Sequence, residues 1–233
     1  MHGEIASFPI PKRQQMMKPM STLRITEIFH SLQGESKTVG IPTVFVRLTG
    51  CPLRCQYCDT AYAFDGGELM DLDAIKKVLE EVACDYVTVT GGEPLAQPNC
   101  LSLLEQLCDS GYNVSLETSG AMPIEGVDKR VSIVMDLKTP ASAEADKNRY
   151  ENIAFLKPSD QVKFVICNEK DYLWSKAKLD QYDLRAKVNE ILFSPSFNEI
   201  EPAQLAEWIL RDKLKIRMQM QLHKQIWGAV AGK

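Results

Sequence analysis

Three cysteines stand close together in the first third of the chain, at a spacing suited to a metal cluster. Cys51, Cys55 and Cys58 lie in the segment Gly-Cys-Pro-Leu-Arg-Cys-Gln-Tyr-Cys-Asp-Thr, residues 50–60. Thiolates are soft ligands that select iron-sulfur clusters, zinc or Cu(I). A cubane cluster is normally held by four cysteines, so three on one short loop leave one iron free to bind a group that is not protein. The spacing therefore predicts an iron-sulfur site with one open coordination position.

A structural zinc site is the alternative interpretation of the same three cysteines. Its fourth ligand would come from Cys84, Cys100, Cys108 or one of the three histidines. Structural zinc usually takes its ligands as two close pairs, and the sequence holds no second Cys-x2-Cys and no His-x3-His pair. The other four cysteines, which include Cys167, fall in or beside apolar periodic segments, where a thiol behaves as a small core residue.

Two residues beside the cysteines suggest a substrate site. Along a strand, Arg47 shares a face with Thr43 and Phe45, while Val44, Val46 and Leu48 line the other face. A guanidinium on a pocket-facing side would bind a planar carboxylate through two parallel hydrogen bonds. Thr60 follows Asp59 directly after the last cysteine. Because Mg²⁺ favours hard oxygen ligands and often binds through few protein groups, the Thr60 hydroxyl is a candidate magnesium ligand.

The apolar pattern predicts the elements that must position these residues. Strands alternate with helices, which indicates an α/β fold with a parallel sheet. About six core strands are too few for a closed eight-stranded barrel, so we expect an open, partial parallel β/α barrel. The expected strands are 22–28, 43–48, 86–90, 113–118, 132–136, 161–166, 190–193 and 215–219, and the expected helices are one that follows Asp71, then 99–110, 169–180 and 202–212.

Polar motifs follow several of these strands. In parallel barrels the active site forms at the carboxyl ends of the strands. Such motifs are the cysteine loop after Leu48, Gly-Gly-Glu-Pro at 91–94, Glu-Thr-Ser-Gly at 117–120, Asp-Leu-Lys at 136–138 and Ser-Pro-Ser at 194–196. Their shared location predicts one pocket. Residues 31–36, Ser-Leu-Gln-Gly-Glu-Ser, are expected to form a polar loop before the cysteines.

Length and composition fit a single globular domain. The chain has 233 residues, 45% of them hydrophobic and 25% charged, with a net charge of −4. No basic excess points to a nucleic-acid partner, and no apolar run approaches the length of a membrane span. The seven cysteines are an odd number, and three of them lie within eight residues, which indicates metal ligands and buried thiols in a reducing cytoplasm and not a disulfide framework. Residues 1–20 lack the apolar region of a signal peptide, so we expect a disordered extension there and one domain over 21–233.

The cysteine spacing, with the aromatic Tyr57 before the last cysteine, resembles the signature of the radical S-adenosylmethionine (SAM) superfamily. In that superfamily the amino and carboxylate groups of SAM bind the open iron of a [4Fe-4S] cluster. Two glycines at 91–92 would let the main chain approach a ligand that a Cβ would repel. The resemblance implies that SAM is held by Tyr57, Asp59, Gly92, Glu93, Ser119, Asp136, Leu137 and Lys138.

Further motifs resemble the 7-carboxy-7-deazaguanine synthases of the queuosine (7-deazapurine) pathway. They are Leu-Gln-Gly-Glu at 32–35, Arg-x3-Cys-x3-Cys-x2-Cys-Asp-Thr at 47–60, Thr-Gly-Gly-Glu-Pro at 90–94, Glu-Thr-Ser-Gly at 117–120 and Gln-Leu-His-Lys at 221–224. The resemblance runs from about Leu23 to His223 and implies a lyase that converts 6-carboxy-5,6,7,8-tetrahydropterin to 7-carboxy-7-deazaguanine and ammonia. SAM would be a regenerated cofactor, and Mg²⁺ would bridge Thr60 to the substrate.

The same resemblance assigns roles to individual residues and partners. Glu35 and Arg47 would be catalytic, and the pterin would be held by Leu32, Gln33, Gly34, Glu35, Arg47, Thr90 and His223. A low-potential carrier such as flavodoxin would reduce the cluster, and the chain would form a homodimer. A glycyl-radical-enzyme activase is the second enzyme candidate, since it is also a short radical SAM protein. Residues 225–233 match no motif.

Overall fold

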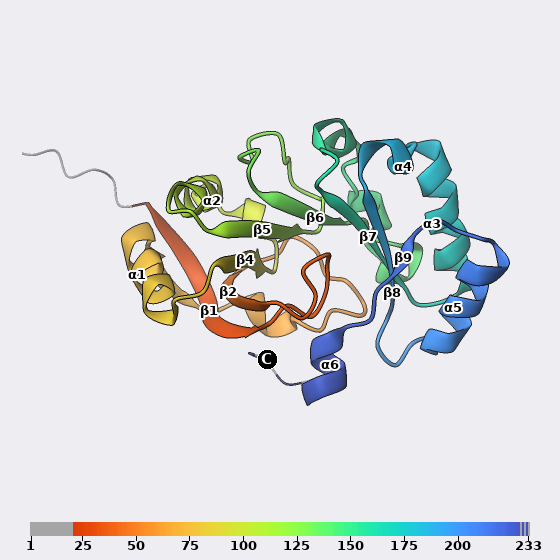
Figure 1. The fold of residues 1–233 in the computed structure, drawn as a ribbon, viewed down its shortest axis with the longest axis horizontal. Coiled ribbons are helices and arrows are strands. Elements are labelled where there is room, and N and C mark those ends of the chain that lie inside the picture. Colours follow the sequence, from red (N-terminus) through yellow and green to blue (C-terminus); the bar gives the residue numbers. More distant parts are fainter. Residues whose placement is uncertain (1–20, 229, 231, 233) are drawn as a thin grey trace, which may run out of the picture.

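The computed structural model describes residues 21–228, 230 and 232 (Figure 1). The expected disordered extension over 1–20 lies outside the described residues. The strands are β1 Thr22–Leu32, β2 Pro42–Leu48, β3 Glu68–Asp71, β4 Tyr86–Gly91, β5 Asn113–Thr118, β6 Ser132–Asp136, β7 Gln161–Ile166, β8 Glu190–Pro195 and β9 Arg217–Met218. The helices are α1 Leu72–Val82, α2 Cys100–Asp109, α3 Glu169–Gln181, α4 Leu184–Lys187, α5 Pro202–Arg211 and α6 Leu222–Trp227.

The described strands form one sheet in the order β3-β1-β2-β4-β5-β6-β7-β8-β9. β1 pairs antiparallel with both β2 and β3, whereas every neighbouring pair from β2 to β9 is parallel. The sheet begins at β3 and ends at β9, so it does not close on itself. The expected open, partial parallel β/α barrel is confirmed, with β2 and β4–β8 as its six longer parallel strands.

Helices cover the outer face of the sheet, with α1 and α2 along one half and α3 to α5 along the other (Figure 1). Local signals fix where they begin. Asp71 caps α1 by accepting a hydrogen bond from the Ala74 amide at 2.7 Å, and Asn168 caps α3 in the same way. Pro202 occupies the first turn of α5, where its missing N–H costs nothing.

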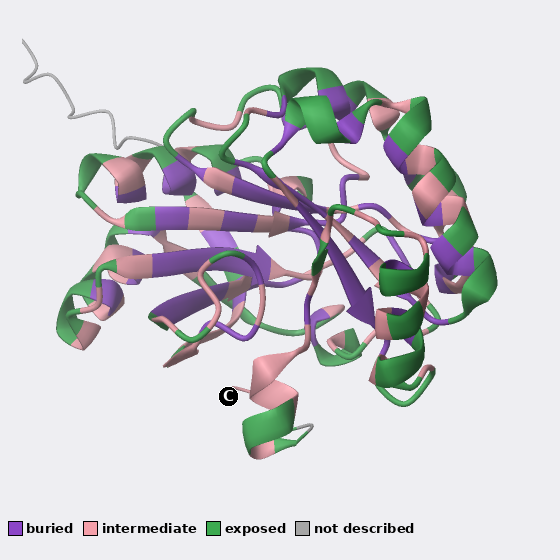
Figure 2. Cartoon of the chain, turned by 45° about the vertical axis from the view of Figure 1, so that its right-hand side comes forward, coloured by how far each residue is buried: buried purple, intermediate pink, exposed green. Residues whose placement is uncertain are grey.

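Along the parallel strands, alternate side chains face the helices and the inside of the curved sheet. The buried apolar residues form two clusters, a first core cluster from β1, β2, β4, β5, α1 and α2 and a second core cluster from β6–β8 and α3–α5. In β4, Val87 and Val89 belong to the first cluster, and in β7, Val162 and Phe164 belong to the second. The alternating positions carry residues that line the inner cavities: Thr90 in β4, Glu117 in β5, Asp136 in β6, Lys163 in β7 and Ser194 in β8. Figure 2 shows this layering, with buried residues on the strands and exposed residues on the outward helix faces.

Several elements differ from the sequence-based expectation. β1 extends to Leu32, so residues 31 and 32 are strand and not loop, because they pair with Thr43 and Pro42 of β2. β3, α4 and α6 are not anticipated by the apolar pattern, since each is short and depends on a neighbour. Among the described helices, none is long and apolar enough to cross a membrane.

Candidate active site

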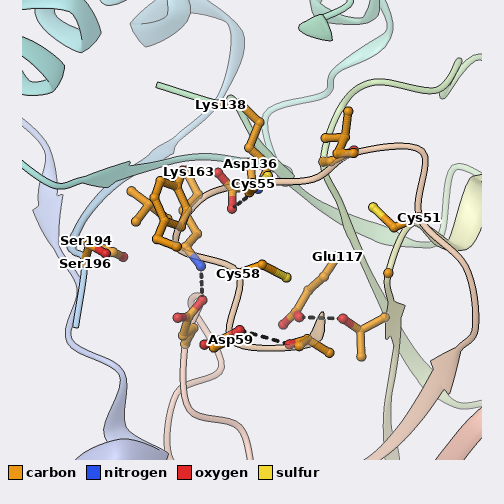
Figure 3. Close-up of a pocket in the computed structure, with 18 of the residues that line it drawn as sticks. Cys51, Cys55, Cys58, Asp59, Glu117, Asp136, Lys138, Lys163, Ser194 and Ser196 are labelled. Atoms are coloured by element: carbon orange, nitrogen blue, oxygen red, sulfur yellow. Dashed lines mark hydrogen bonds and ion pairs between the residues drawn. The ribbon is translucent and has the colours of Figure 1, made fainter. Parts of the chain in front are cut away.

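The cysteine loop connects the end of β2 to a short 3-10 helix at Ala61–Ala63. Backbone hydrogen bonds fix its ends: the Gly50 amide donates to the Ala63 carbonyl at 2.8 Å, and the Glu93 amide donates to the Gly50 carbonyl at 2.8 Å. Cys51, Cys55 and Cys58 are free, half-buried thiols. All three line one pocket of about 430 Å³ at the carboxyl ends of the strands (Figure 3).

Burial disfavours the thiolate form of two of the three cysteines, Cys51 and Cys55. Burial raises the pKa of Cys55 to about 11 and also raises the pKa of Cys51. Among the described residues, no group of three His, Cys, Asp or Glu side chains is arranged to hold a metal ion. The thiols therefore share a cavity wall without forming a closed ligand set. A cationic metal cluster would lower these pKa values by stabilising the thiolates.

The four remaining cysteines lie away from this wall. Cys100 is fully buried in the first core cluster, and Cys84 and Cys108 pack against it. Cys167 is buried near the end of β7. None of these four side chains lines the pocket that holds the cysteine loop, so the arrangement offers the loop no fourth thiol.

The turn after β4 packs directly against the cysteine loop. A Cβ on Gly92 would lie 2.3 Å from the Gly50 carbonyl oxygen and 2.7 Å from the Cys51 Cβ. Both distances are shorter than real Cβ contacts, so only glycine permits this approach. From the sequence alone, the two glycines at 91–92 are expected to leave this space to a ligand. In the structure, the main chain of the cysteine loop fills it, although Gly91 and Gly92 still line the pocket.

Glu93 lies behind the pocket wall and not on it. Its side chain is fully buried and does not line the cavity. Its carboxylate accepts hydrogen bonds from the Ser119 amide at 2.7 Å, the Ser119 hydroxyl at 2.5 Å, the Thr118 hydroxyl at 2.9 Å and the Leu95 amide at 3.0 Å. Glu93 therefore joins the β4 and β5 loops, and Ser119 reaches the cavity in its place.

The loop after β6 adds a charged pair to the same wall. Lys138 Nζ lies 3.0 Å from Asp136 Oδ2, and the two side chains are 12% and 19% exposed. Although burial opposes its charge, Asp136 raises the pKa of Lys138 and keeps it protonated. Asp136 Oδ1 and the Tyr57 hydroxyl are buried and have no hydrogen-bond partner within the described chain. Leu137 turns instead into the second core cluster.

A second cavity adjoins the first and collects the residues expected to hold a pterin. Its lining includes Leu32, Gln33, Gly34, Glu35, Arg47, Thr90 and His223. Nine residues line both cavities, so the two are continuous: Glu35, Asp59, Thr60, Thr90, Gly91, Glu117, Lys163, Gln221 and Lys224. The wall that carries Cys51, Cys55 and Cys58, here called the cysteine wall, and the segment 32–35 therefore line one continuous cavity.

His223 reaches this cavity from the far end of the chain. The Leu222 amide donates to the Gly34 carbonyl at 2.9 Å, which docks α6 against the end of β1. His223 lies so close over Gly34 that a Cβ at Gly34 would fall 2.0 Å from His223 Nδ1. Burial lowers the pKa of His223, which favours the neutral imidazole. The late histidine thus belongs to the cavity wall.

Asp59 and Thr60 lie where the two cavities meet. Lys224 of α6 forms an ion pair with Asp59 at 2.6 Å, and the Thr60 hydroxyl donates to the other Asp59 oxygen at 2.9 Å. Although the partial burial of the half-exposed Asp59 side chain acts in the opposite direction, Lys224 holds the pKa of Asp59 well below its usual range. The Asp59–Lys224 pair ties α6 to the cysteine loop.

Two site residues have no role in the prediction from sequence: Glu117, although it lies in the Glu-Thr-Ser-Gly motif, and Lys163, which belongs to no motif. Lys163 forms a buried ion pair with Glu35, and its charge holds the pKa of Glu35 below the usual value although burial acts in the opposite direction. Glu117 accepts a hydrogen bond from the Thr90 hydroxyl at 3.0 Å. Burial, and then the nearby Glu35, raise the pKa of Glu117. The sequence does carry a signal for Lys163, which is the only charged residue in the apolar strand Gln-Val-Lys-Phe-Val-Ile at 161–166.

Comparisons with known proteins agree with this architecture. The model of the radical SAM superfamily matches residues 45–140. The chain is 44% identical over 215 residues to the 7-carboxy-7-deazaguanine synthase of Chlorobaculum tepidum, an alignment that covers 91% of this chain and 97% of the relative. It is 42% identical to the synthase of the same name from Koribacter versatilis, over 88% of this chain and 97% of the relative.

A solved structure supports the fold independently. The crystal structure of QueE from Escherichia coli aligns with a TM-score of 0.68 and 22% sequence identity, and covers 87% of this chain and 95% of that chain. The structure of SuiB from Streptococcus suis aligns with a TM-score of 0.55 over 77% of this chain and 48% of that chain, at 12% identity. At these identities the likeness shows the fold alone.

Proposed function

The chain belongs to the 7-carboxy-7-deazaguanine synthases, a radical SAM family, and on this premise we propose that its cavity converts 6-carboxy-5,6,7,8-tetrahydropterin to 7-carboxy-7-deazaguanine and ammonia. One observation carries the proposal: the cysteine wall and the residues 32–35 line one continuous space. A cofactor held by the cysteines and a small substrate held by the other wall would meet there. The radical SAM family uses a [4Fe-4S] cluster and SAM, which supply a radical that takes a hydrogen atom from the substrate.

The residues of the first cavity fit these cofactors. Cys51, Cys55 and Cys58 are soft ligands on one loop, and they would hold three irons of a cluster. SAM carries an amino group, a carboxylate and ribose hydroxyls, and the partnerless Asp136 Oδ1 and Tyr57 hydroxyl can pair with such groups. In this proposal Gly92, Ser119, Asp59 and Lys138 complete the SAM site. Glu93 and Leu137 support it from behind.

The second cavity supplies the groups for a carboxylated pterin. Arg47 would bind the carboxylate as a bidentate partner, with Leu32, Gln33, Gly34, Thr90 and His223 around the ring system. Glu35 and Arg47 act as the catalytic pair of the proposal. Lys163 keeps Glu35 ionised, so Glu35 can accept a hydrogen bond from the ring. His223 and Lys224 of α6 form the wall at this end of the cavity.

Neither of the other candidate functions uses the second cavity. A glycyl-radical-enzyme activase would dock a protein loop and needs neither Arg47 nor the segment 32–35. A zinc module needs a fourth ligand near the cysteine loop, and Cys84, Cys100 and Cys108 face the helix-covered core. The small, polar cavity therefore favours the lyase.

An anaerobic product assay tests the proposed function. The reconstituted protein, reductant, SAM, Mg²⁺ and 6-carboxytetrahydropterin are incubated, and the product is identified by mass spectrometry. We expect 7-carboxy-7-deazaguanine and one ammonia per product. SAM cleavage without the deazaguanine would contradict the substrate assignment, and a colourless zinc protein would contradict the cluster.

The magnesium proposal has its own variant. Thr60 lines both cavities, so its hydroxyl can reach a metal between loop and substrate. We expect Thr60→Ala to lose most of the Mg²⁺ stimulation of turnover, while Thr38→Ala, which deletes a hydroxyl that lines neither cavity, keeps it. An unchanged Mg²⁺ dependence in Thr60→Ala would remove Thr60 from the magnesium site.

The remaining parts of the proposal concern partners and compartment. A low-potential carrier such as flavodoxin would reduce the cluster, the chain would work as a homodimer, and the seven free thiols suit a reducing cytoplasm. Sedimentation of the reconstituted protein tests the dimer, and a monomer at assay concentration would contradict it. Turnover with reduced flavodoxin in place of dithionite tests the electron donor.

A further inference from the structure

Arg47 is held from behind by a carboxylate that lies outside both cavities. Its Nε donates to Glu27 Oε1 at 2.7 Å, and the two side chains are 15% and 23% exposed. The Tyr62 hydroxyl donates to the same Glu27 oxygen at 2.8 Å. Arg47 and Tyr62 line the second cavity, whereas Glu27 does not. One oxygen of Glu27 therefore anchors two residues of the cavity wall.

A β-bulge makes this contact. Ile25 of β1 lies opposite Leu48 of β2, but the register then shifts so that Glu27, and not Thr26, lies opposite Arg47. Directly opposed residues of an antiparallel pair point to the same face, so the extra residue brings Glu27 onto the face of Arg47. The bulged Thr26 is accommodated by a hydroxyl contact with Thr49 at 2.8 Å. Bulges next to active sites commonly re-aim a side chain in this way.

The contact with Glu27 leaves the two Nη groups of Arg47 free to bind a ligand. Glu27 engages Nε alone, and within the described chain neither Nη group of Arg47 is paired with a carboxylate or carbonyl. The rings of Phe29 and Tyr62 lie 5.6 and 5.8 Å from the guanidinium carbon and restrict its tilt. The two Nη groups are therefore the donors that Arg47 offers to the cavity.

We propose that Glu27 is a positioning residue that orients Arg47, through Nε and with Tyr62, so that both Nη groups face the carboxylate of the substrate. The inference rests on the proposed function, because it assumes a carboxylated ligand in the second cavity. Orientation matters here because bidentate pairing requires the planar guanidinium and the carboxylate to be coplanar. A freely rotating Arg47 would have to be ordered at the expense of binding free energy.

The opposite role for Glu27 makes the opposite prediction. If Glu27 merely competed with the substrate for Arg47, its removal would free the guanidinium and strengthen the binding of carboxylated ligands. Two variants separate the roles. Glu27→Ala removes the anchor, whereas Glu27→Gln keeps an amide oxygen that can accept from Arg47 Nε and from the Tyr62 hydroxyl. A positioning role therefore predicts rescue by glutamine.

Binding of a stable oxidised analogue tests the proposal without turnover. The dissociation constants of 6-carboxypterin and of pterin, which lacks the carboxylate, are measured by calorimetry on the cluster-loaded, SAM-bound protein. Glu190→Ala is the matched control, because Glu190 also forms a cross-strand ion pair, with Arg217 at 2.8 Å, yet lines neither of the two cavities. Iron content and melting temperature confirm that each variant folds and loads its cluster.

We expect Glu27→Ala to weaken 6-carboxypterin binding by about tenfold or more, since hydrogen bonds to charged groups are strong, and to leave pterin binding unchanged. Glu27→Gln should stay within about threefold of wild type because it keeps the acceptor. In an Arg47→Ala background, Glu27→Ala should have no further effect, because Glu27 acts through Arg47.

Each contrary result overturns the proposal. Tighter binding by Glu27→Ala would show competition, equal weakening of both ligands would show a general structural role, and additive weakening in the Arg47→Ala background would show action by another route. If Glu27→Gln weakened 6-carboxypterin binding as much as Glu27→Ala does, the negative charge of Glu27 would matter, and not the position of Arg47. If the wild type does not bind 6-carboxypterin, the proposed function falls together with this inference. If it binds normally but Glu27→Ala has no effect, only the inference on Glu27 falls.

Discussion

Removal of the Glu93 carboxylate tests how the SAM side of the cavity is held together. Glu93 is fully buried and accepts hydrogen bonds from two backbone amides, those of Ser119 and Leu95, and from the hydroxyls of Thr118 and Ser119. In Glu93→Ala the hydroxyls can turn to other acceptors. The two amides cannot, because their directions are fixed by the main chain. The variant therefore leaves two donors without a partner.

The magnitude follows from those two amides. Each unsatisfied buried donor costs about 1–3 kcal/mol, which gives a loss in the free energy of unfolding of about 4 kcal/mol for the pair. In a domain of this size, 1 kcal/mol lowers the melting temperature by about 2–4 °C. We therefore expect Glu93→Ala to melt about 8–16 °C below wild type.

The assay is thermal unfolding of the anaerobic protein, followed by circular dichroism. Glu105→Ala is the control, because Glu105 lies on the exposed side of α2, and such a substitution changes stability by only about 0.5 kcal/mol. SAM binding to both variants is measured in parallel, and we expect it to weaken only in Glu93→Ala, because Ser119 loses its support. A melting temperature of Glu93→Ala equal to that of Glu105→Ala would refute the reasoning.

Two further variants test the electrostatics and the packing of the site. Burial raises the pKa of Glu117 above its usual value, so the wild type loses stability as the pH rises through the raised pKa. Glu117→Gln stays neutral at every pH, so its free energy of unfolding should exceed that of the wild type by more at pH 8 than at pH 5. An equal gain at both pH values, measured by urea unfolding, would contradict this. In Gly92→Ala the new Cβ would lie 2.3 Å from the Gly50 carbonyl oxygen, so we expect a loss of about 1–3 kcal/mol and less iron per chain. Gly126→Ala, whose Cβ meets only the end of a side chain, should load normally; equal iron contents would contradict the clash.

The sequence predicts those parts of the site that depend on local pattern. Alternation along β2 correctly places Phe45 and Arg47 on the cavity side and Val44 and Val46 in the core. The rule that parallel strands place their carboxyl ends at one edge correctly brings the motifs into one cavity. The position of Leu32 differs, because its pairing with Pro42 extends β1.

Contacts between distant segments could not be read from the sequence. Lys163 and Glu35 are separated by 128 positions and meet only because the sheet curves. Glu93 follows two glycines whose backbone freedom hides the direction of its side chain, and the structure turns it away from the cavity. Glu27 reaches Arg47 only through a bulge, and alternation alone would have assigned Thr26 to that place.

The most direct test of the account counts products formed per SAM molecule. The reconstituted protein receives reductant, Mg²⁺ and an excess of 6-carboxytetrahydropterin, with SAM well below the concentration of the pterin, and the deazaguanine and any 5′-deoxyadenosine are quantified together. The account predicts many molecules of 7-carboxy-7-deazaguanine per SAM and little 5′-deoxyadenosine, because SAM acts as a regenerated cofactor beside the pterin. Stoichiometric 5′-deoxyadenosine without deazaguanine would contradict it.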